Sequence, residues 1–409
     1  MRIKRSEIID VLIWVLVGFY TLIAHWIWFG RGIQETVIVS LMLIQVLRNL
    51  NWKRQNVGSI LLPFVVIVYF IYSSIKSSSR AYLLQDVKSI MGGMISMYYL
   101  YSFWRNDNGK CIRFITKSCD ILKGYMWINS VIILIQYIVP YFLMNRTAIN
   151  IINNSAYFDQ LTGLIGINGT TRWNTLSCIT IITYLNSAKS KRDYWKTGAF
   201  ILLSIIISML NSARAFLLML PLMLILYYLI VVSKTPKRVV KISAIIIGVT
   251  TLGYLIYKTN SYVNYYINDL IEDKFAIYNS RDLAYMVRAN DDRAVAINYA
   301  IINGGWSGKG LGSIPMHFAN EYVKYLGINS TSSFVYMLGG VGYLLVTAVF
   351  SVSTALIVDE AHRLIRFIEI LLFWLIASYL LPVYSSIVMM FCLSMIMIIM
   401  GAAVRKQRI

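Results

Sequence analysis

Long apolar runs separated by short polar connections dominate this chain. Crossing the hydrocarbon core of a bilayer requires a helix of about 17–25 mainly apolar residues. We therefore predict an all-α integral membrane protein with about twelve transmembrane helices, the range being roughly 10–14. The predicted spans are 8–29, 34–50, 57–75, 88–104, 119–143, 172–188, 196–212, 214–232, 241–257, 332–357, 367–382 and 384–403.

The first apolar run, from Ile8 to Phe29, follows the basic start Met1–Arg5. A secretory signal peptide has a shorter apolar region followed by a cleavage site flanked by small residues. This run is longer and no such site follows it, so we expect it to be the first span.

Patches of basic residues fall in alternate connections between the predicted spans. The patches are Arg2/Lys4/Arg5, Arg48/Lys53/Arg54, Arg105/Lys110/Arg113/Lys117, Lys189/Lys191/Arg192/Lys196, Lys234/Lys237/Arg238/Lys241, Arg363/Arg366 and Arg405/Lys406/Arg408. By the positive-inside rule these connections face the cytoplasm, and both termini do too. Three regions follow: 1–257 holds helices 1–9 and an outer segment 144–171, 258–331 is one large periplasmic loop, and 332–409 holds helices 10–12 and a short cytoplasmic tail.

Composition agrees with this interpretation. The 409 residues are 58% hydrophobic and 14% charged, whereas soluble domains are about 25% charged. The net charge of +20 is divided among patches between apolar runs, so it indicates topology and no nucleic-acid partner. The four cysteines show no CxxC spacing and no HExxH motif occurs, so the sequence indicates no metal, no cofactor and no disulfide framework.

The loop 258–331 is longer than a linker requires, and long loops tend to be functional. We expect helix between Asp282 and Ile302, where helix breakers are few. On a single helix Arg281 and Arg288 would share a face, with Arg293 about 140° away from Arg288. These arginines either belong to a functional site or form salt bridges on a solvated helix.

Two further arginines lie at predicted outer ends of spans. Arg214 occupies a connection too short to reach far into water, and Arg172 stands at the foot of the sixth span. A charge at that depth is costly unless it is paired or functional. Either the guanidinium groups extend to lipid headgroups, or they bind a phosphate or diphosphate, whose oxygens suit a planar fork of donors.

The segment Gly304–Ser313 resembles a phosphate-binding loop. A Walker A motif would need glycine at position 303 and serine or threonine at position 310, and no strand–helix unit supports a Rossmann fingerprint. Nucleotide binding is thereby excluded. Gly308, Gly310, Gly312 and Ser313 can still expose N–H groups to an anion or a sugar, the alternative being a plain turn.

His317 is the one histidine in the large loop, just after these glycines. It is a candidate proton acceptor near neutral pH, although a structural role is the alternative. Asp291, Asp292 and Glu321 are the other candidate bases. The adjacent pair Asp291 and Asp292 also fits salt bridges with Arg288 and Arg293.

The order of these features resembles the superfamily of O-antigen polymerases (Wzy) and O-antigen ligases. The matching segments are Ser212-Ala213-Arg214, Arg293 ahead of Gly308-Lys309-Gly310-Leu311-Gly312-Ser313, and Ser332-Ser333-Phe334-Val335-Tyr336-Met337-Leu338-Gly339-Gly340-Val341-Gly342. Ligases carry a histidine just before the last of these segments, where this chain has Ser330-Thr331-Ser332. The resemblance therefore favours the polymerase.

The resemblance implies a GT-C-like membrane glycosyltransferase of lipopolysaccharide biosynthesis in the bacterial inner membrane, acting on the periplasmic side without a metal. Donor and acceptor would be undecaprenyl-diphosphate-linked oligosaccharides in the membrane lipid, and a chain-length regulator protein is an implied partner. Arg214 and Arg293 would meet the diphosphate, supported by Arg172, Arg281 and Arg288, with His317 as base. The alternatives are a ligase and a transporter or flippase. A transporter is expected to show internal repeats and helices broken near mid-membrane.

Overall fold

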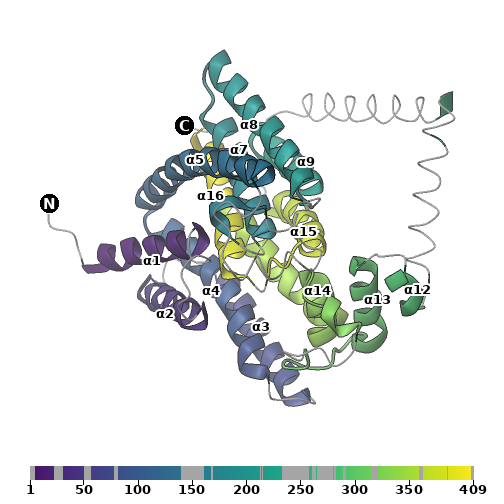
Figure 1. Cartoon of the computed structure of the whole chain (residues 1–409). Coiled ribbons are helices and arrows are strands. Elements are labelled where there is room, and N and C mark those ends of the chain that lie inside the picture. The colour runs from purple at the N-terminus through teal and green to yellow at the C-terminus, as the bar shows by residue number, and fades with distance from the viewer. Residues whose placement is uncertain are drawn as a thin grey trace. The chain divides into compact units, whose positions relative to one another are not determined.

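The computed structural model (Figure 1) describes most of the chain. The described residues are 5–22, 31–49, 57–77, 82–139, 161–166, 169–211, 213, 215–232, 258–259, 264, 280, 282–288, 292–314, 321–358, 363–384 and 386–406.

Every regular element among these residues is a helix. The first part of the chain forms α1 (Arg5–Leu22), α2 (Arg31–Asn49), α3 (Val57–Lys76), α4 (Leu83–Asn106), α5 (Asn108–Ile138) and the 3₁₀ turn η3 (Gly163–Ile165). The middle forms α7 (Thr170–Ser187), α8 (Lys191–Leu210), α9 (Ala215–Tyr227) and the π-helical continuation η4 (Tyr228–Val232). The remainder forms α12 (Leu283–Arg288), α13 (Asp292–Gly304), η5 (Val323–Tyr325), α14 (Ser330–Val358), α15 (Arg363–Leu380) and α16 (Ile387–Lys406).

Five of the described helices are long and apolar enough to cross a membrane. They are Asn108–Ile138, Lys191–Leu210, Ala215–Val232, Ser330–Val358 and Ile387–Lys406. The prediction of an all-α chain with membrane-length apolar helices is thus confirmed. The count of twelve spans stays a prediction, and the span expected at 241–257 lies outside the described residues.

Two helices begin earlier than their apolar runs. α5 starts at Asn108 and not near residue 119, because the Asp107 side chain accepts a hydrogen bond from the Lys110 N–H (2.9 Å) and caps the helix. α8 starts at Lys191 and not at residue 196, because Ser190 and Asp193 form a reciprocal capping box. Polar caps extend a span beyond its apolar part, so hydrophobicity alone misplaces these two boundaries.

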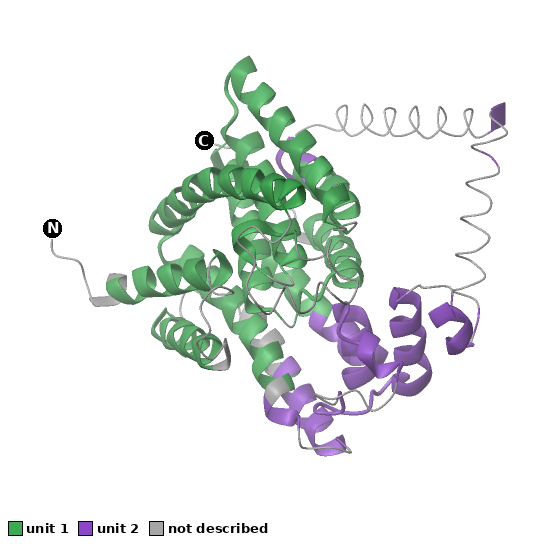
Figure 2. Cartoon of the chain, in the orientation of Figure 1, with its two compact units in different colours: residues 1–65, 85–227, 347–409 green, residues 66–84, 228–346 purple. Residues whose placement is uncertain are grey.

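The chain divides into two compact units (Figure 2). Unit 1 comprises residues 1–65, 85–227 and 347–409, and unit 2 comprises residues 66–84 and 228–346. The boundary falls inside α3 and inside α14, so each of these helices contributes one segment to each unit.

Within unit 1, α16 packs against α7 and α5. Glycines permit close contact between helices, since a Cβ on Gly401 would overlap the Ile357 carbonyl and one on Gly93 would overlap the Tyr384 carbonyl. Hydroxyls within the apolar helices bond to the carbonyl four residues earlier, as Thr180 does to Leu176 (2.8 Å). Polar residues are therefore accommodated without breaking these helices.

Polar contacts also link helix ends in unit 1. At one end, the Asn106 amide donates to the Asn49 carbonyl (3.0 Å), and the Arg405 guanidinium lies 4.6 Å from the centre of the Trp104 ring. The basic patches predict that these ends lie on one side of a membrane. That topology stays a prediction, and so does the side that faces the cytoplasm.

Candidate functional site

The glycine-rich segment after α13 crosses α14 inside unit 2, and we call this crossing the glycine clasp (residues 304–312 with 335–341). Main-chain hydrogen bonds join Lys309 N to Tyr336 O (2.8 Å), Gly310 N to Met337 O (2.9 Å), Gly340 N to Gly305 O (3.0 Å) and Val341 N to Trp306 O (3.3 Å). These bonds bring the two backbones into direct contact, and the glycines at positions 308 and 339 leave the space for it. Two segments that lie about thirty positions apart in the chain are thus bound to each other.

α14 is broken at the centre of the clasp. Gly339 has φ 75° and ψ 173°, which no helix contains, and the loop occupies the gap that results. A Cβ on Gly339 would overlap the Trp306 carbonyl, and one on Gly308 would overlap the Met337 carbonyl. Gly308 also has φ 71°. Glycine at both positions is therefore required by the backbone crossing itself.

Side chains of α3 form hydrogen bonds with the backbone of α14 at the break. The Tyr69 hydroxyl donates to the Leu338 carbonyl (2.7 Å) and accepts from the Gly342 N–H, so it replaces the helical bond between those two residues. The Ser73 hydroxyl accepts from Leu311 N (3.2 Å) and reaches the Met337 carbonyl at 3.5 Å. The carbonyls and N–H groups released by the kink are thus bound by protein groups.

The exposed rim of the clasp carries an indole and two ammonium groups. Trp306 is 75% exposed, while part of its ring packs over Gly340. The Lys76 ammonium donates to the Ser307 hydroxyl (2.6 Å), and Lys309 is exposed. Tryptophan together with lysine is typical of the zone where a membrane meets water.

Two of the glycines predicted to bind an anion use their N–H groups in hydrogen bonds within the clasp. The Gly308 N–H donates to the Gly304 carbonyl (2.9 Å), and the Gly310 N–H donates to Met337. Gly312, with φ 83°, is the last loop residue of the clasp, and Ser313 follows it. Substrate binding by Gly308, Gly310, Gly312 and Ser313 stays a prediction.

Three tyrosines stack beside the clasp. Tyr299 of α13 lies between Tyr322 and Tyr336, with ring centres 5.9 Å and 5.8 Å apart and planes inclined by 25° and 23°. All three side chains are partly exposed. Partial burial raises the pKa of Tyr322, and the neighbouring Glu321 raises it further, so its hydroxyl stays protonated near neutral pH. The stack offers aromatic faces and hydroxyl groups together.

Helix between Asp282 and Ile302 is confirmed, but as two helices. α12 ends at Arg288 and α13 begins at Asp292, so the expected 140° separation of Arg288 and Arg293 on one helix is wrong. Met286, Ala294 and Val295 form a small core against which Tyr322 packs. Arg288 is the last residue of α12 and Arg293 lies in the first turn of α13, so the two arginines belong to different elements.

The two arginines differ in exposure. The Arg288 side chain is 75% exposed and lies 3.9 Å from the Asp282 carboxylate, which also caps α12 through the Ala284 N–H (2.9 Å). Arg293 is partly buried, and its Nε atom has no contact with solvent. A charge held partly out of water interacts more strongly with a ligand than an exposed one.

Arg172 lies in unit 1, near the start of α7. Its guanidinium stacks on the Tyr20 ring at 5.2 Å and reaches the Tyr20 carbonyl at 3.4 Å. The Tyr20 hydroxyl donates to Glu35, and Glu35 pairs with Lys88 at 2.9 Å. This charge is thus held in a network linking α1, α2, α4 and α7.

Several predicted residues lie outside the described part of the chain: Arg214, Arg281, Asp291 and His317. Their roles stay predictions. Of the other candidate bases, Glu321 is exposed beside Tyr322, and Asp292 opens α13. Among the described residues no three histidine, cysteine or acidic side chains gather as a metal site would require, and all four cysteines are buried thiols.

Tyr69, Ser73, Tyr299 and Tyr322 were not singled out from the sequence. The chain contains 29 tyrosines, so no single tyrosine is a signal. Their importance arises from contacts with residues far away in sequence. Comparisons with models of known protein families and with curated proteins find no match for this chain.

Proposed function

We propose that this chain is a membrane-embedded glycosyltransferase that polymerises lipid-linked oligosaccharides, of the O-antigen polymerase type. The observation that carries the proposal is the tyrosine stack in unit 2, next to a core flanked by Arg288 and Arg293. The electron-rich face of an aromatic ring attracts the partly positive C–H face of a sugar. Guanidinium groups complement a diphosphate.

In the proposed reaction, a base takes up a proton and cationic groups stabilise the leaving diphosphate. The acceptor sugar hydroxyl forms a bond to the anomeric carbon of the donor, and the bond from that carbon to the diphosphate oxygen breaks. The hydroxyl proton passes to a base, for which His317 is the first candidate, and undecaprenyl diphosphate leaves. Negative charge develops on the leaving oxygen, where Arg293 and Arg214 act, with Arg172, Arg281 and Arg288 in support.

The fold class in this proposal is a multi-pass protein of the bacterial inner membrane, GT-C-like, with about twelve spans and its site facing the periplasm. Both substrates would carry their lipid in the surrounding bilayer. A chain-length regulator protein is the partner that this reaction class implies.

A transporter is the second candidate, because two observations favour it. α14 is broken within a membrane-length helix, and Asp10 is buried in α1, where Gln45 and Tyr99 bond to its carboxylate at 2.8 Å and 3.0 Å. Buried acids and broken helices are typical of transport proteins. In α14, however, protein groups already bind the polar atoms at the break, which leaves them occupied and not directed at an ion.

Surface polysaccharide from a deletion strain separates the candidates. Loss of a polymerase leaves surface lipid capped with a single repeat unit, whereas loss of a flippase or a ligase removes even that unit. Polymer restored by the wild-type gene and single repeats without it would support the proposal. Loss of the single repeat would contradict it.

Variants then test the residues. Removing a donor that stabilises developing charge costs roughly 10²–10³ in rate, so Arg293→Ala and Arg214→Ala should each leave single repeats. Arg293→Lys should not rescue, because an ammonium cannot replace a planar fork. Lys324→Ala is the control, an exposed cation on the Tyr325 ring that has no role in the proposal. Full polymer length in both arginine variants would rule out this assignment.

The tyrosine stack has its own test. Tyr299→Leu removes the central ring and should shorten the polymer or abolish it. Tyr285→Leu removes a tyrosine of α12 that is 37% exposed and outside the stack, and polymer length should not change. Equal polymer from the two variants would exclude a role of the stack in sugar binding.

A further inference from the structure

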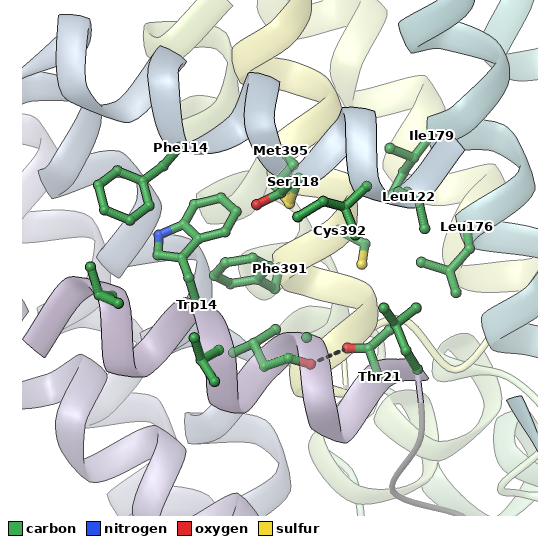
Figure 3. A pocket seen from close by; sticks show the side chains of 16 residues that line it. Trp14, Thr21, Phe114, Ser118, Leu122, Leu176, Ile179, Phe391, Cys392 and Met395 are labelled. Atoms are coloured by element: carbon green, nitrogen blue, oxygen red, sulfur yellow. Dashed lines mark hydrogen bonds between the residues drawn. The ribbon is translucent and has the colours of Figure 1, made fainter. Parts of the chain in front are cut away.

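Unit 1 contains a cavity of about 310 Å³ between α1, α5, α7 and α16 (Figure 3). Its walls are apolar and include Trp14, Leu176, Ile179, Phe391 and Met395, all buried. The polar groups that it contacts are few. One of them, the Thr21 hydroxyl, is already bound to the Val17 carbonyl (2.6 Å).

The apolar lining of the cavity determines what can occupy it. An apolar cavity stays free of water, because a water molecule needs two to four polar partners. In a protein within a bilayer, the surrounding medium offers hydrocarbon chains. The volume lies at the lower end of the range for ligand pockets, roughly 300–1,000 Å³, which suits one chain and not a bulky ligand.

The cavity is open toward the surface. Val15 of α1 and Ile121 of α5 line it and are themselves 61% and 68% exposed. Apolar side chains exposed on membrane helices face lipid, so a chain can enter between these two residues from the side.

Arg172 carries a charge close to the cavity without lining it. It lies one helical turn before the wall residue Leu176 and interacts electrostatically with Cys392, another wall residue. Its guanidinium stacks on the ring of Tyr20, the neighbour of Thr21. Glu35 and Lys88 lie close by, joined to Tyr20 through its hydroxyl. The Arg172 guanidinium brings positive charge to this end of α7, which suits the anionic headgroup of a phospholipid.

We propose that this cavity holds an acyl chain of an anionic phospholipid, whose phosphodiester headgroup is bound by Arg172. The lipid is a resident component of unit 1. The proposal does not rest on the function proposed above, but it assigns Arg172 to this lipid in place of a supporting role at the diphosphate.

The test uses full-length protein purified in detergent and incubated with equal amounts of phosphatidylglycerol and phosphatidylcholine of identical chains. Native mass spectrometry should detect one retained phosphatidylglycerol, preferred about fivefold over zwitterionic phosphatidylcholine, as one cation near a headgroup of net negative charge provides. Arg172→Gln should abolish the preference. Equal retention of both lipids by the wild-type protein would overturn the proposal.

Filling the cavity tests the position of the chain. Gly18 lines the cavity and Gly198 lies on α8, and a Cβ on either would meet nothing within 4 Å. Gly18→Phe should lower retention of phosphatidylglycerol at least about fivefold, whereas Gly198→Phe should leave it unchanged. Equal retention by the two variants would contradict the assignment.

A second matched pair applies if Gly18→Phe does not fold. Val15→Trp narrows the mouth of the cavity, and Leu12→Trp changes a similarly exposed position of α1 that is not in its lining. Only Val15→Trp should reduce retention. Displacement of phosphatidylglycerol by an equal amount of undecaprenyl diphosphate would show a substrate site instead and would overturn the resident-lipid proposal.

Discussion

The two ends of α14 are held in different ways. The segment in unit 1, Thr347–Val358, is held by side chains: Tyr384 donates to the Thr347 hydroxyl (3.0 Å), and Trp374 donates to the Thr354 hydroxyl (3.1 Å). The Phe350 ring packs against both of these rings, with ring centres 4.9 Å from Tyr384 and 5.9 Å from Trp374. The segment in unit 2 is held by main-chain bonds to residues 305–310 within the glycine clasp and by Tyr69.

The two segments of α14 should differ in how well they tolerate a substitution. Side chains in an apolar core adjust when a neighbour changes, so such regions tolerate substitutions of similar size. Two backbones in direct contact cannot adjust, because a Cβ between them displaces a hydrogen bond. We therefore expect the clasp to be the more sensitive of the two regions.

The largest effect is expected for Gly308→Ala. The new Cβ overlaps the Met337 carbonyl at a positive φ, which should destabilise the clasp by at least about 3 kcal/mol. Gly305→Ala is the matched control: its φ is 57°, but its Cβ meets nothing, so the cost should be about 1 kcal/mol. The measurement is trypsin cleavage after the exposed Lys309, which reports local opening. Similar cleavage rates in the two variants would show that the overlap has no consequence.

Tyr69→Phe should rank second. It leaves the Leu338 carbonyl and the Gly342 N–H without their bridging hydroxyl, at a cost of about 1–3 kcal/mol. Tyr72→Phe, three residues along α3 on a ring that is 52% exposed, should cost almost nothing. The same cleavage assay distinguishes them. If Tyr72→Phe accelerates cleavage as much as Tyr69→Phe, the inserted hydroxyl does not stabilise the kink.

Tyr384→Phe tests the side-chain-held end of α14. The ring keeps its contact with Phe350, and the bond to Thr347 is lost together with a weak one to the Trp374 carbonyl (3.5 Å). A side-chain hydrogen bond within a membrane is typically worth about 0.6 kcal/mol. The labelling rate of the buried Cys392 thiol should rise less than threefold or so. If the Cys392 labelling rate in Tyr384→Phe rose by a larger factor than the Lys309 cleavage rate in Tyr69→Phe, the segment of α14 in unit 1 would be the more sensitive one.

The smallest effect is expected for Arg288→Ala. Its ion pair with Asp282 is exposed and 3.9 Å long, so its loss should change stability by less than about 0.5 kcal/mol. Cleavage after Lys309 should stay at the wild-type rate. Because the proposed function gives Arg288 a supporting role, a shorter polymer without a change in cleavage would separate function from stability.

Several features were predictable because they depend on composition along the chain. Long apolar runs require helices in a membrane, and the alternation of basic connections groups helix ends. Helix near residues 282–302 follows from local propensity. Candidate arginines could be named for a similar reason, since a charge at the end of an apolar run is conspicuous by itself.

The contacts of the site were not predictable in this way. α14 is broken at Gly339, and the Tyr69 hydroxyl binds the carbonyl of Leu338 next to the break. Tyr69 and Leu338 are 269 positions apart, so no local sequence pattern identifies this partner. The tyrosine stack, the separation of Arg288 from Arg293 and the cavity near Arg172 arise in the same manner. Hydrophobicity adds up residue by residue, so the sequence alone determined a helical membrane protein. Hydrogen bonds and the space available to a Cβ depend on which distant segments meet, so only the tertiary structure decided the clasp, the aromatic faces and the cavity.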